Sequence, residues 1–197
     1  MVSAAILNGG RATRFGGRDK GGLVAGGRTI RDRQLTVLAT LSDDLLIVGG
    51  DGRMPGGVPV RLIADRHPGL GPLAGLEAAL TEARHDVVVV VACDMPGITA
   101  SFLAQLLARV ESVDAVVPRT ESGYHPLCAV YRRTCLPVVS QRLADGRLAM
   151  KGIFDAVRVR EVSGPELAAS GDPARLLANV NTPADYDEIT GLLNHEP

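Results

Sequence analysis

A loop rich in glycine and arginine follows the first apolar segment of the chain. Residues 7–20 read LNGGRATRFGGRDK, with cations at Arg11, Arg14, Arg18 and Lys20. Glycine allows backbone N–H groups to close on phosphate oxygens, and nearby cations suit a triphosphate that must release pyrophosphate. The loop lacks the P-loop pattern, because Gly21 rather than Ser or Thr follows Lys20. These features predict a phosphate-binding loop of another type.

Two carboxylates come directly after predicted buried strands. Asp94 follows closely on Val87–Ala92, a run of valines and one alanine that is typical of a central parallel strand, and Asp65 follows Val58–Ile63. Mg²⁺ takes one or two carboxylates and completes its coordination with phosphate oxygens and water. Asp94 is therefore a candidate Mg²⁺ ligand beside a triphosphate. Asp65 is a second candidate, for which a ribose or base contact is equally open.

The elements that must position these residues alternate between strand and helix. Strands are expected at 2–7, 45–48, 58–63, 87–92 and 115–117, and helices at 28–41, 73–83 and 100–110. This order predicts an α/β domain with a mainly parallel, twisted sheet flanked by helices. Ligands of such sheets bind beyond the carboxyl ends of the strands. We therefore expect one site built from the strand ends at Asn8-Gly9-Gly10, Gly49-Gly50, Asp65 and Asp94.

The character of the chain changes after Pro118, although no linker is present. Residues 119–124 are polar and rich in turn formers, and 126–131 and 157–162 are expected to be extended. Helices are expected at 132–144, 149–156 and 183–193. We interpret residues 1–197 as a single domain.

The composition excludes several classes of function. The chain has 197 residues, a net charge of −1 and 3% aromatic residues. A nearly neutral chain is poorly suited to electrostatic binding of nucleic acid or of an anionic membrane, and few aromatic rings are available for stacking on single strands. The apolar start is too short for a signal peptide, and no apolar run is long enough to span a membrane, so the expected compartment is the cytoplasm.

Cysteine and histidine show no metal-binding spacing. The cysteines form no CxxC pair, so we expect neither zinc nor a disulfide framework but small buried thiols at Cys93, Cys128 and Cys135. Three of the histidines are too scattered to predict a metal site, namely His67, His85 and His125. Of these, His125 could face a substrate.

Five motifs together resemble the molybdenum cofactor guanylyltransferase family, also called the molybdopterin-guanine dinucleotide biosynthesis protein A family. They are LNGG, RFGG and DK within 7–20, GPLAG at 71–75, CDMP at 93–96, HPL at 125–127 with Tyr131, and NVNTP at 179–183. Each is weak by itself, but the set runs in family order over nearly the whole chain. The resemblance implies a single-domain, Rossmann-like nucleotidyltransferase fold.

The same resemblance implies a reaction. GMP would be transferred from GTP to the terminal phosphate of molybdenum-loaded molybdopterin, with release of pyrophosphate and use of Mg²⁺. Residues 1–118 would bind the nucleotide, and residues 119–197 would bind the acceptor. The implied partner proteins are those of molybdenum-cofactor biosynthesis and of molybdoenzyme maturation.

The resemblance also implies roles for individual residues. Leu7, Asn8 and Gly9 would meet the guanine nucleotide through backbone atoms, and the nucleotide-binding set is completed by Gly10, Lys20, Asp65 and Asp94. The catalytic residues would neutralise charge as pyrophosphate leaves. They are Arg14, Lys20 and Asp94, of which Asp94 would also ligate Mg²⁺. The acceptor-binding residues would be His125, Asn179 and Asn181.

Two departures from the family pattern concern the nucleotide side. The family usually has alanine at the position of Asn8, and some members carry a polar nucleotide contact at the position of Gly49. A cytidylyltransferase or another sugar-nucleotide pyrophosphorylase of the same fold is the nearest alternative, and a nucleotide-binding module without turnover is another. Gly9-Gly10 and the segment 71–75 favour the guanylyl branch. The presence of both Lys20 and Asp94 favours an active enzyme.

Overall fold

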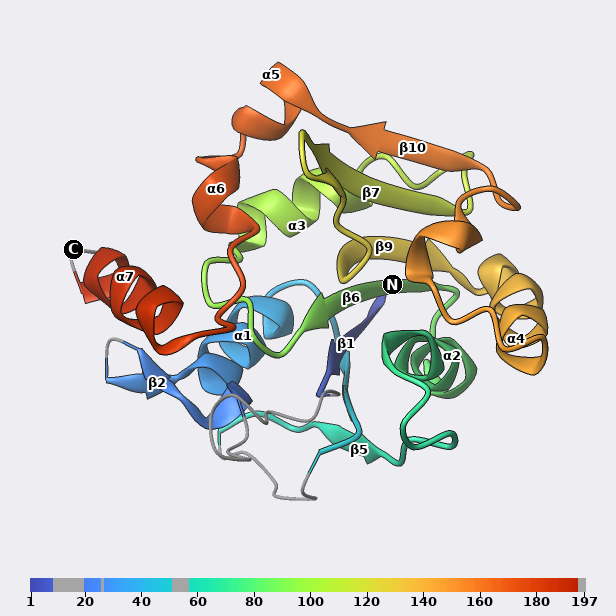
Figure 1. The fold of residues 1–197 in the computed structure, drawn as a ribbon, viewed down its shortest axis with the longest axis horizontal. Helices are drawn as coiled ribbons and strands as arrows, with labels where there is room; N and C mark the ends of the chain where they lie inside the picture. The colour runs from blue at the N-terminus through green and yellow to red at the C-terminus, as the bar shows by residue number, and fades with distance from the viewer. Residues whose placement is uncertain (9–19, 26, 51–56, 195–197) are drawn as a thin grey trace.

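A mixed eight-stranded sheet organises the chain, with helices on both of its faces (Figure 1). The computed structural model describes residues 1–8, 20–25, 27–50 and 57–194. Seven strands follow the order β10-β7-β9-β6-β1-β4-β5, and β8 pairs with β7 off this path. The strands are β1 Ser3–Leu7, β4 Asp44–Val48, β5 Arg61–Ile63, β6 Val87–Ala92, β7 Ala115–Thr120, β8 Gly123–Tyr124, β9 Cys128–Arg132 and β10 Val159–Val162.

The centre of the sheet is parallel and buried. β1 pairs in parallel with β4 on one side and with β6 on the other. Every residue of β1 is buried, as is every residue of β6 after Val87. Strands that are covered on both faces need such continuous apolar runs, which is why these strands could be predicted.

One inserted strand makes the sheet mixed. β9 runs antiparallel between β6 and β7, with Cys128 opposite Val91. The remaining pairs of long strands are parallel, because β5 pairs with β4 and β10 pairs with β7. The predicted fold class, a mainly parallel sheet flanked by helices, is confirmed.

The helices cover the sheet in two layers. Leu38 of α1 and Phe102 of α3 join a buried cluster with Ile6 on one face of the sheet. On the other face, α2 and α4 contribute to a second cluster, which contains Leu46 and Leu76. The helices are α1 Ile30–Ala39, α2 Pro72–Glu82, α3 Ala100–Leu107, α4 Leu136–Ala144, α5 Gly164–Ala168, α6 Pro173–Leu176 and α7 Pro183–Asn194.

Several short elements differ from the sequence-based expectation. The hairpin β2–β3 (Val24–Ala25 and Arg28–Thr29) and the helices α5 and α6 were not predicted. The expected helix at 149–156 is only the 3-10 turn η4, Met150–Ile153. Nη2 of Arg142 donates to the carbonyl of Ala149, the residue that precedes this turn (3.1 Å).

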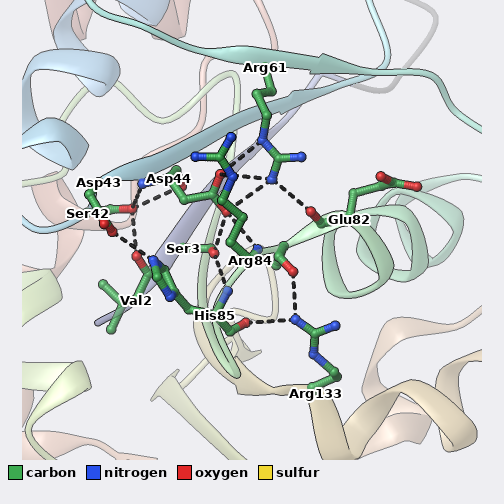
Figure 2. A network of polar contacts seen from close by, with 11 residues as sticks. Val2, Ser3, Ser42, Asp43, Asp44, Arg61, Glu82, Arg84, His85 and Arg133 are labelled. Carbon is green, nitrogen blue, oxygen red and sulfur yellow. Dashed lines mark hydrogen bonds and ion pairs between the residues drawn. The ribbon is translucent and has the colours of Figure 1, made fainter.

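A polar network closes the amino-terminal edge of the sheet (Figure 2). Asp44 is 2% exposed and accepts hydrogen bonds from Ser3 Oγ (2.6 Å), Arg61 Nη2 (2.8 Å) and the backbone N–H of Arg84 (2.8 Å). Arg61 also donates to the carbonyl of Glu82 (2.7 Å). Burial by itself raises the pKa of Asp44, but these hydrogen bonds outweigh it and hold the pKa below its ordinary value.

The three cysteines are buried thiols, as expected, and form no disulfide with one another. Burial raises the pKa of Cys128 to about 12, and burial followed by the charge of Asp114 does the same for Cys135. Such thiols are not nucleophiles at neutral pH. Within the described ranges, no helix combines the length and the apolar character needed to cross a membrane.

Candidate active site

The carboxyl ends of β6, β1 and β4 lie side by side in the sheet. Leu7 ends β1, and its carbonyl accepts a hydrogen bond from the N–H of Cys93 (3.2 Å), which follows β6. The N–H of Asn8 donates to the carbonyl of Val48 at the end of β4 (2.9 Å). The register of these parallel strands therefore brings Leu7, Asn8 and the segment of Asp94 to one edge. This is the edge at which the sequence predicted a site.

The side chain of Asn8 lies against the glycine pair that follows β4. Gly49 and Gly50 have φ angles of +76° and +95°, which side chains rarely tolerate. A Cβ atom at Gly50 would also overlap the carboxamide of Asn8. Since the N–H of Asn8 is already bonded within the sheet, its carbonyl and its side chain are the groups that could reach a nucleotide.

Asp94 is half-buried in the turn between β6 and α3. Its carbonyl accepts a hydrogen bond from the N–H of Val180 (2.8 Å), which belongs to the C-terminal segment. Gln34 of α1 forms hydrogen bonds with the turn on both sides of Asp94. Its Nε2 donates to the carbonyls of Ala92 (2.7 Å) and Met95 (3.0 Å). Gln34 was not predicted. Its signal in the sequence is a polar residue on the buried face of a helix.

Asp65 lies farther along the same edge. It comes two residues after β5 and is half-buried, and its Oδ1 accepts a hydrogen bond from the N–H of His67 (2.9 Å). Because β1 and β4 separate β5 from β6, the two strands that precede Asp65 and Asp94 are three strand spacings apart, roughly 14 Å. The role expected of Asp65 remains a prediction.

His125 borders a pocket of about 400 Å³ between the β7–β8 turn and α6. Its Nε2 lies 2.8 Å from Oγ1 of Thr120. Burial, and then the charge of Lys151, lower the pKa of His125, so the imidazole is neutral at pH 7. The N–H of Ala92 donates to the carbonyl of Leu127 (2.8 Å), which ties the β8–β9 connection that contains His125 to the end of β6. A pocket of this volume accommodates a small organic ligand.

Asn179 and Asn181 flank Val180, whose backbone is bonded to Asp94. Val180 is fully buried, which anchors the segment. Oδ2 of Asp185 accepts hydrogen bonds from the N–H groups of Asn181 (2.8 Å) and of the following residue (2.9 Å), as in a capping box at the start of α7. The structure thus places the predicted acceptor residues of the C-terminal segment beside the turn of Asp94.

The glycine-rich loop is mostly outside the described residues. Gly9, Gly10 and Arg14 fall within 9–19, and the description resumes at Lys20. Lys20 begins the 3-10 helix η2, Lys20–Gly22, and Leu23 after it accepts a hydrogen bond from the N–H of Ile30 (2.9 Å). The roles expected of these loop residues remain predictions.

A divalent ion at this edge would be held jointly by protein and substrate. In the part of the chain that the structure describes, no group of three or more His, Cys, Asp or Glu side chains is arranged to hold a metal. Mg²⁺ is commonly bound by one or two carboxylates together with substrate phosphates. The carboxylate of Asp94 at a strand end fits an ion of that kind.

Comparison with known proteins decides the family. The family model described as a MobA-like NTP transferase domain matches residues 4–160. A molybdenum cofactor guanylyltransferase of Desulfosudis oleivorans is 33% identical over 188 residues, which cover 95% of this chain and 93% of the relative. The chain belongs to the molybdenum cofactor guanylyltransferase family. It is therefore a nucleotidyltransferase, and neither the cytidylyltransferase nor the module without turnover is favoured.

Solved structures share the fold of this guanylyltransferase-family chain. Molybdopterin-guanine dinucleotide biosynthesis protein A from Archaeoglobus fulgidus has a TM-score of 0.81 at 22% identity, covering 96% of this chain and 97% of that one. Rv0371C from Mycobacterium tuberculosis, solved in complex with manganese, has a TM-score of 0.65 at 18% identity, covering 96% and 98%. Both span nearly the whole chain, which agrees with a single domain.

Proposed function

We propose that this protein transfers GMP from GTP to the terminal phosphate of molybdenum-loaded molybdopterin and releases pyrophosphate. The family to which the chain belongs supports this reaction. The observation that supports this location for the reaction is the hydrogen bond from the N–H of Val180 to the carbonyl of Asp94 (2.8 Å). It joins the end of β6, on the nucleotide side, to the segment expected to bind the acceptor. Donor and acceptor would then meet at Asp94.

The reaction is an in-line displacement at the α-phosphorus of GTP. An oxygen of the acceptor phosphate forms a bond to that phosphorus, and the bond to the bridging oxygen of pyrophosphate breaks. Because both reactants are polyanions, the protein must position them and neutralise charge. Mg²⁺, when bound, supplies part of that neutralisation. Asp94 would hold the ion, and Arg14 and Lys20 would stabilise the charge that develops on the leaving group.

The nucleotide would extend along the strand ends away from Asp94. With the triphosphate near Asp94 at the end of β6, the nucleoside passes the end of β1, where Leu7, Asn8 and Gly9 would contact it. The next strand end carries Gly49 and Gly50, which bear no Cβ atoms and lie against Asn8. Asp65 after β5 lies still farther out, where a contact with the ribose or base is within reach. Residues 1–118 would then bind the nucleotide.

The acceptor would occupy the side formed by residues 119–197. His125 borders the pocket there, and because its imidazole is neutral it can donate or accept a hydrogen bond without adding charge. Asn179 and Asn181 would contact the acceptor beside Asp94. Proteins of molybdenum-cofactor biosynthesis and of molybdoenzyme maturation are the proposed partners for delivery of the substrate and use of the product.

The deciding experiment measures pyrophosphate release from GTP in the presence of Mg²⁺ and molybdenum-loaded molybdopterin. The expected result is release that depends on both the nucleotide and the acceptor. A protein that binds GTP but releases no pyrophosphate above the blank would be a module without turnover, and the proposal would fail.

We expect GTP to be used at least about 100-fold better than CTP with the same acceptor. Guanine presents two donors and one acceptor at its edge, whereas cytosine is smaller and presents a different edge. Site groups that pair with guanine would be left unsatisfied by cytosine. The specificity constants for the two nucleotides test this, and thermal shifts with GTP, CTP, UTP and ATP give an independent ranking. Equal constants would place the protein in the cytidylyl branch.

Lys20→Ala is expected to lower kcat by about 100-fold, with a smaller change in the KM for GTP. The reason is that the charge opposite Lys20 grows as pyrophosphate leaves. Steady-state kinetics with varied GTP separate the two constants. Arg158→Ala is a suitable control, because it removes an equal charge from a side chain that is 70% exposed and pairs with Asp114 just before β7. A change in KM alone would make Lys20 a ground-state binding residue.

A further inference from the structure

Gln34 lies on the face of α1 that packs against the sheet. It is 0% exposed, and Ile30 and Leu38, one helical turn away on either side, are equally buried. Its Nε2 donates to the carbonyl oxygens of Ala92 (2.7 Å) and Met95 (3.0 Å). These residues follow Gln34 in the sequence by 58 and 61 positions. One carboxamide thus bonds both ends of the turn that contains Asp94.

Main-chain hydrogen bonds also reach this turn. The N–H of Cys93 donates to the carbonyl of Leu7 (3.2 Å), and the N–H of Val180 donates to the carbonyl of Asp94 (2.8 Å). Substitution of a side chain cannot selectively remove such main-chain bonds. Gln34 is different, because both of its bonds depend on one side chain that can be replaced.

The chemistry of the two bonds explains why a glutamine is suited to this position. A carboxamide nitrogen carries two hydrogens and can satisfy two carbonyl oxygens at once. The Oε1 atom of Gln34 is buried and has no hydrogen-bond partner among the described residues, which is destabilising. An aliphatic side chain at this position would avoid that cost but would remove the donor to both carbonyls. The unpaired Oε1 is explained if Nε2 of the same carboxamide is needed to hold the turn that contains Asp94.

We propose that Gln34 is the positioning residue for Asp94. By bonding the carbonyls of Ala92 and Met95, it holds the two residues between them in one conformation. The carboxylate of Asp94 is then presented to the metal and the triphosphate without reordering when they bind. This inference rests on the proposed function, in which Asp94 ligates the metal–nucleotide complex. Gln34 itself contacts neither reactant.

The test compares three variants of the full chain. Gln34→Met keeps the length of the side chain and removes both hydrogen bonds, whereas Gln34→Asn keeps the carboxamide but is one methylene shorter. Leu38→Ala weakens the packing of the same helix one turn away from Gln34. The affinity of Mn²⁺ for the protein–GTP complex is measured by electron paramagnetic resonance. The values of kcat and KM and the thermal unfolding temperature are determined on the same samples.

We expect Gln34→Met to bind Mn²⁺ about 10-fold more weakly in the GTP complex, with a fall of similar size in kcat. Gln34→Asn should also lower the Mn²⁺ affinity and kcat. If Gln34→Met does not fold, the comparison is made with Gln34→Asn. Leu38→Ala should lower the unfolding temperature but keep the parental Mn²⁺ affinity. Gln34 variants that lose thermal stability and keep that affinity would show a packing role only and would overturn the proposal.

A failure of the underlying function would look different. If Asp94→Ala bound Mn²⁺ and GTP as tightly as the parent, Asp94 would not be the ligand, and the positioning role would be overturned together with the metal assignment. If the parent and Asp94→Ala differ while the Gln34 variants match the parent, only the positioning role is overturned.

Discussion

Replacing Asp94 with alanine is expected to lower the rate of guanylyl transfer by about 1,000-fold or more. In the described part of the chain, no group of three or more His, Cys, Asp or Glu side chains is arranged to hold the ion in its place. Without it, the metal and the triphosphate lose the protein group that would anchor them both. Pyrophosphate release under saturating GTP and Mg²⁺ measures the effect. A rate within a few-fold of the parent would show that the metal is held elsewhere.

Asp86 offers a matched control for that experiment. It precedes β6, whereas Asp94 follows the same strand, and its side chain is 57% exposed and paired with Arg132 at 3.1 Å. Asp86→Ala removes the same charge from the opposite end of the strand. It should leave the rate and the metal dependence unchanged. A comparable loss of activity in Asp86→Ala would mean that the effect of Asp94→Ala reflects net charge and not position.

Replacing Asp44 with alanine is expected to lower the free energy of unfolding by about 2–4 kcal/mol. The substitution removes the acceptor of the Ser3 hydroxyl and of the backbone N–H of Arg84, and the guanidinium of Arg61 loses its ion pair (Figure 2). The expected loss is below that of a fully buried pair, because the Arg61 side chain remains 32% exposed. Urea unfolding measures it. The folded fraction should keep its activity, since the network lies at the edge opposite the site.

Asp43 is the natural control for Asp44, because it is the adjacent residue with the same charge. Its side chain is 68% exposed and pairs with His85 at 2.7 Å, so Asp43→Ala should change stability little. If both substitutions cost the same, the buried network would not be the source of the stability.

The effect of Asp44 should also depend on pH. Its pKa in the folded protein is below the ordinary value, so its contribution is fully present above the pKa of the unfolded chain. That contribution is lost as the pH falls through the folded pKa. The difference in stability between parent and Asp44→Ala should therefore be constant above about pH 5 and shrink in more acidic solution. A difference that grows on acidification would contradict this role.

The strands of the central sheet and the edge that bears the site follow from the sequence. The apolar run of β6 predicts a strand covered on both faces, and the helix expected at 100–110 corresponds to α3, at whose start Thr99 Oγ1 accepts a hydrogen bond from the N–H of Phe102 (3.3 Å). These are local signals, because burial pattern and capping involve residues close together in the chain. Parallel topology then places Asp65 and Asp94 at one edge, whatever the details of packing.

The position of β9 and the short elements that hold the C-terminal segment depend on tertiary structure. β9 lies between β6 and β7, although its residues give no sign of strand direction. α6 approaches the turn of Asp94 because Gly97 has no Cβ atom, which would otherwise overlap the carbonyl of Arg175. These partners are far apart in the sequence. Their pairing is selected by the packing of the whole chain rather than by a local pattern.

For the site itself, the sequence determined which residue types stand at the strand ends, and the tertiary structure determined what holds them there. Asp94 could be predicted as a site residue because it follows a strand closely. The two hydrogen bonds of Gln34, in contrast, join it to residues that are 58 and 61 positions away in the sequence. In the sequence, Gln34 is only a polar residue within an apolar helical series. Whether such a residue is exposed, or buried with its nitrogen on two carbonyls, is decided by the elements that pack against the helix, because hydrogen bonds form between neighbours in space.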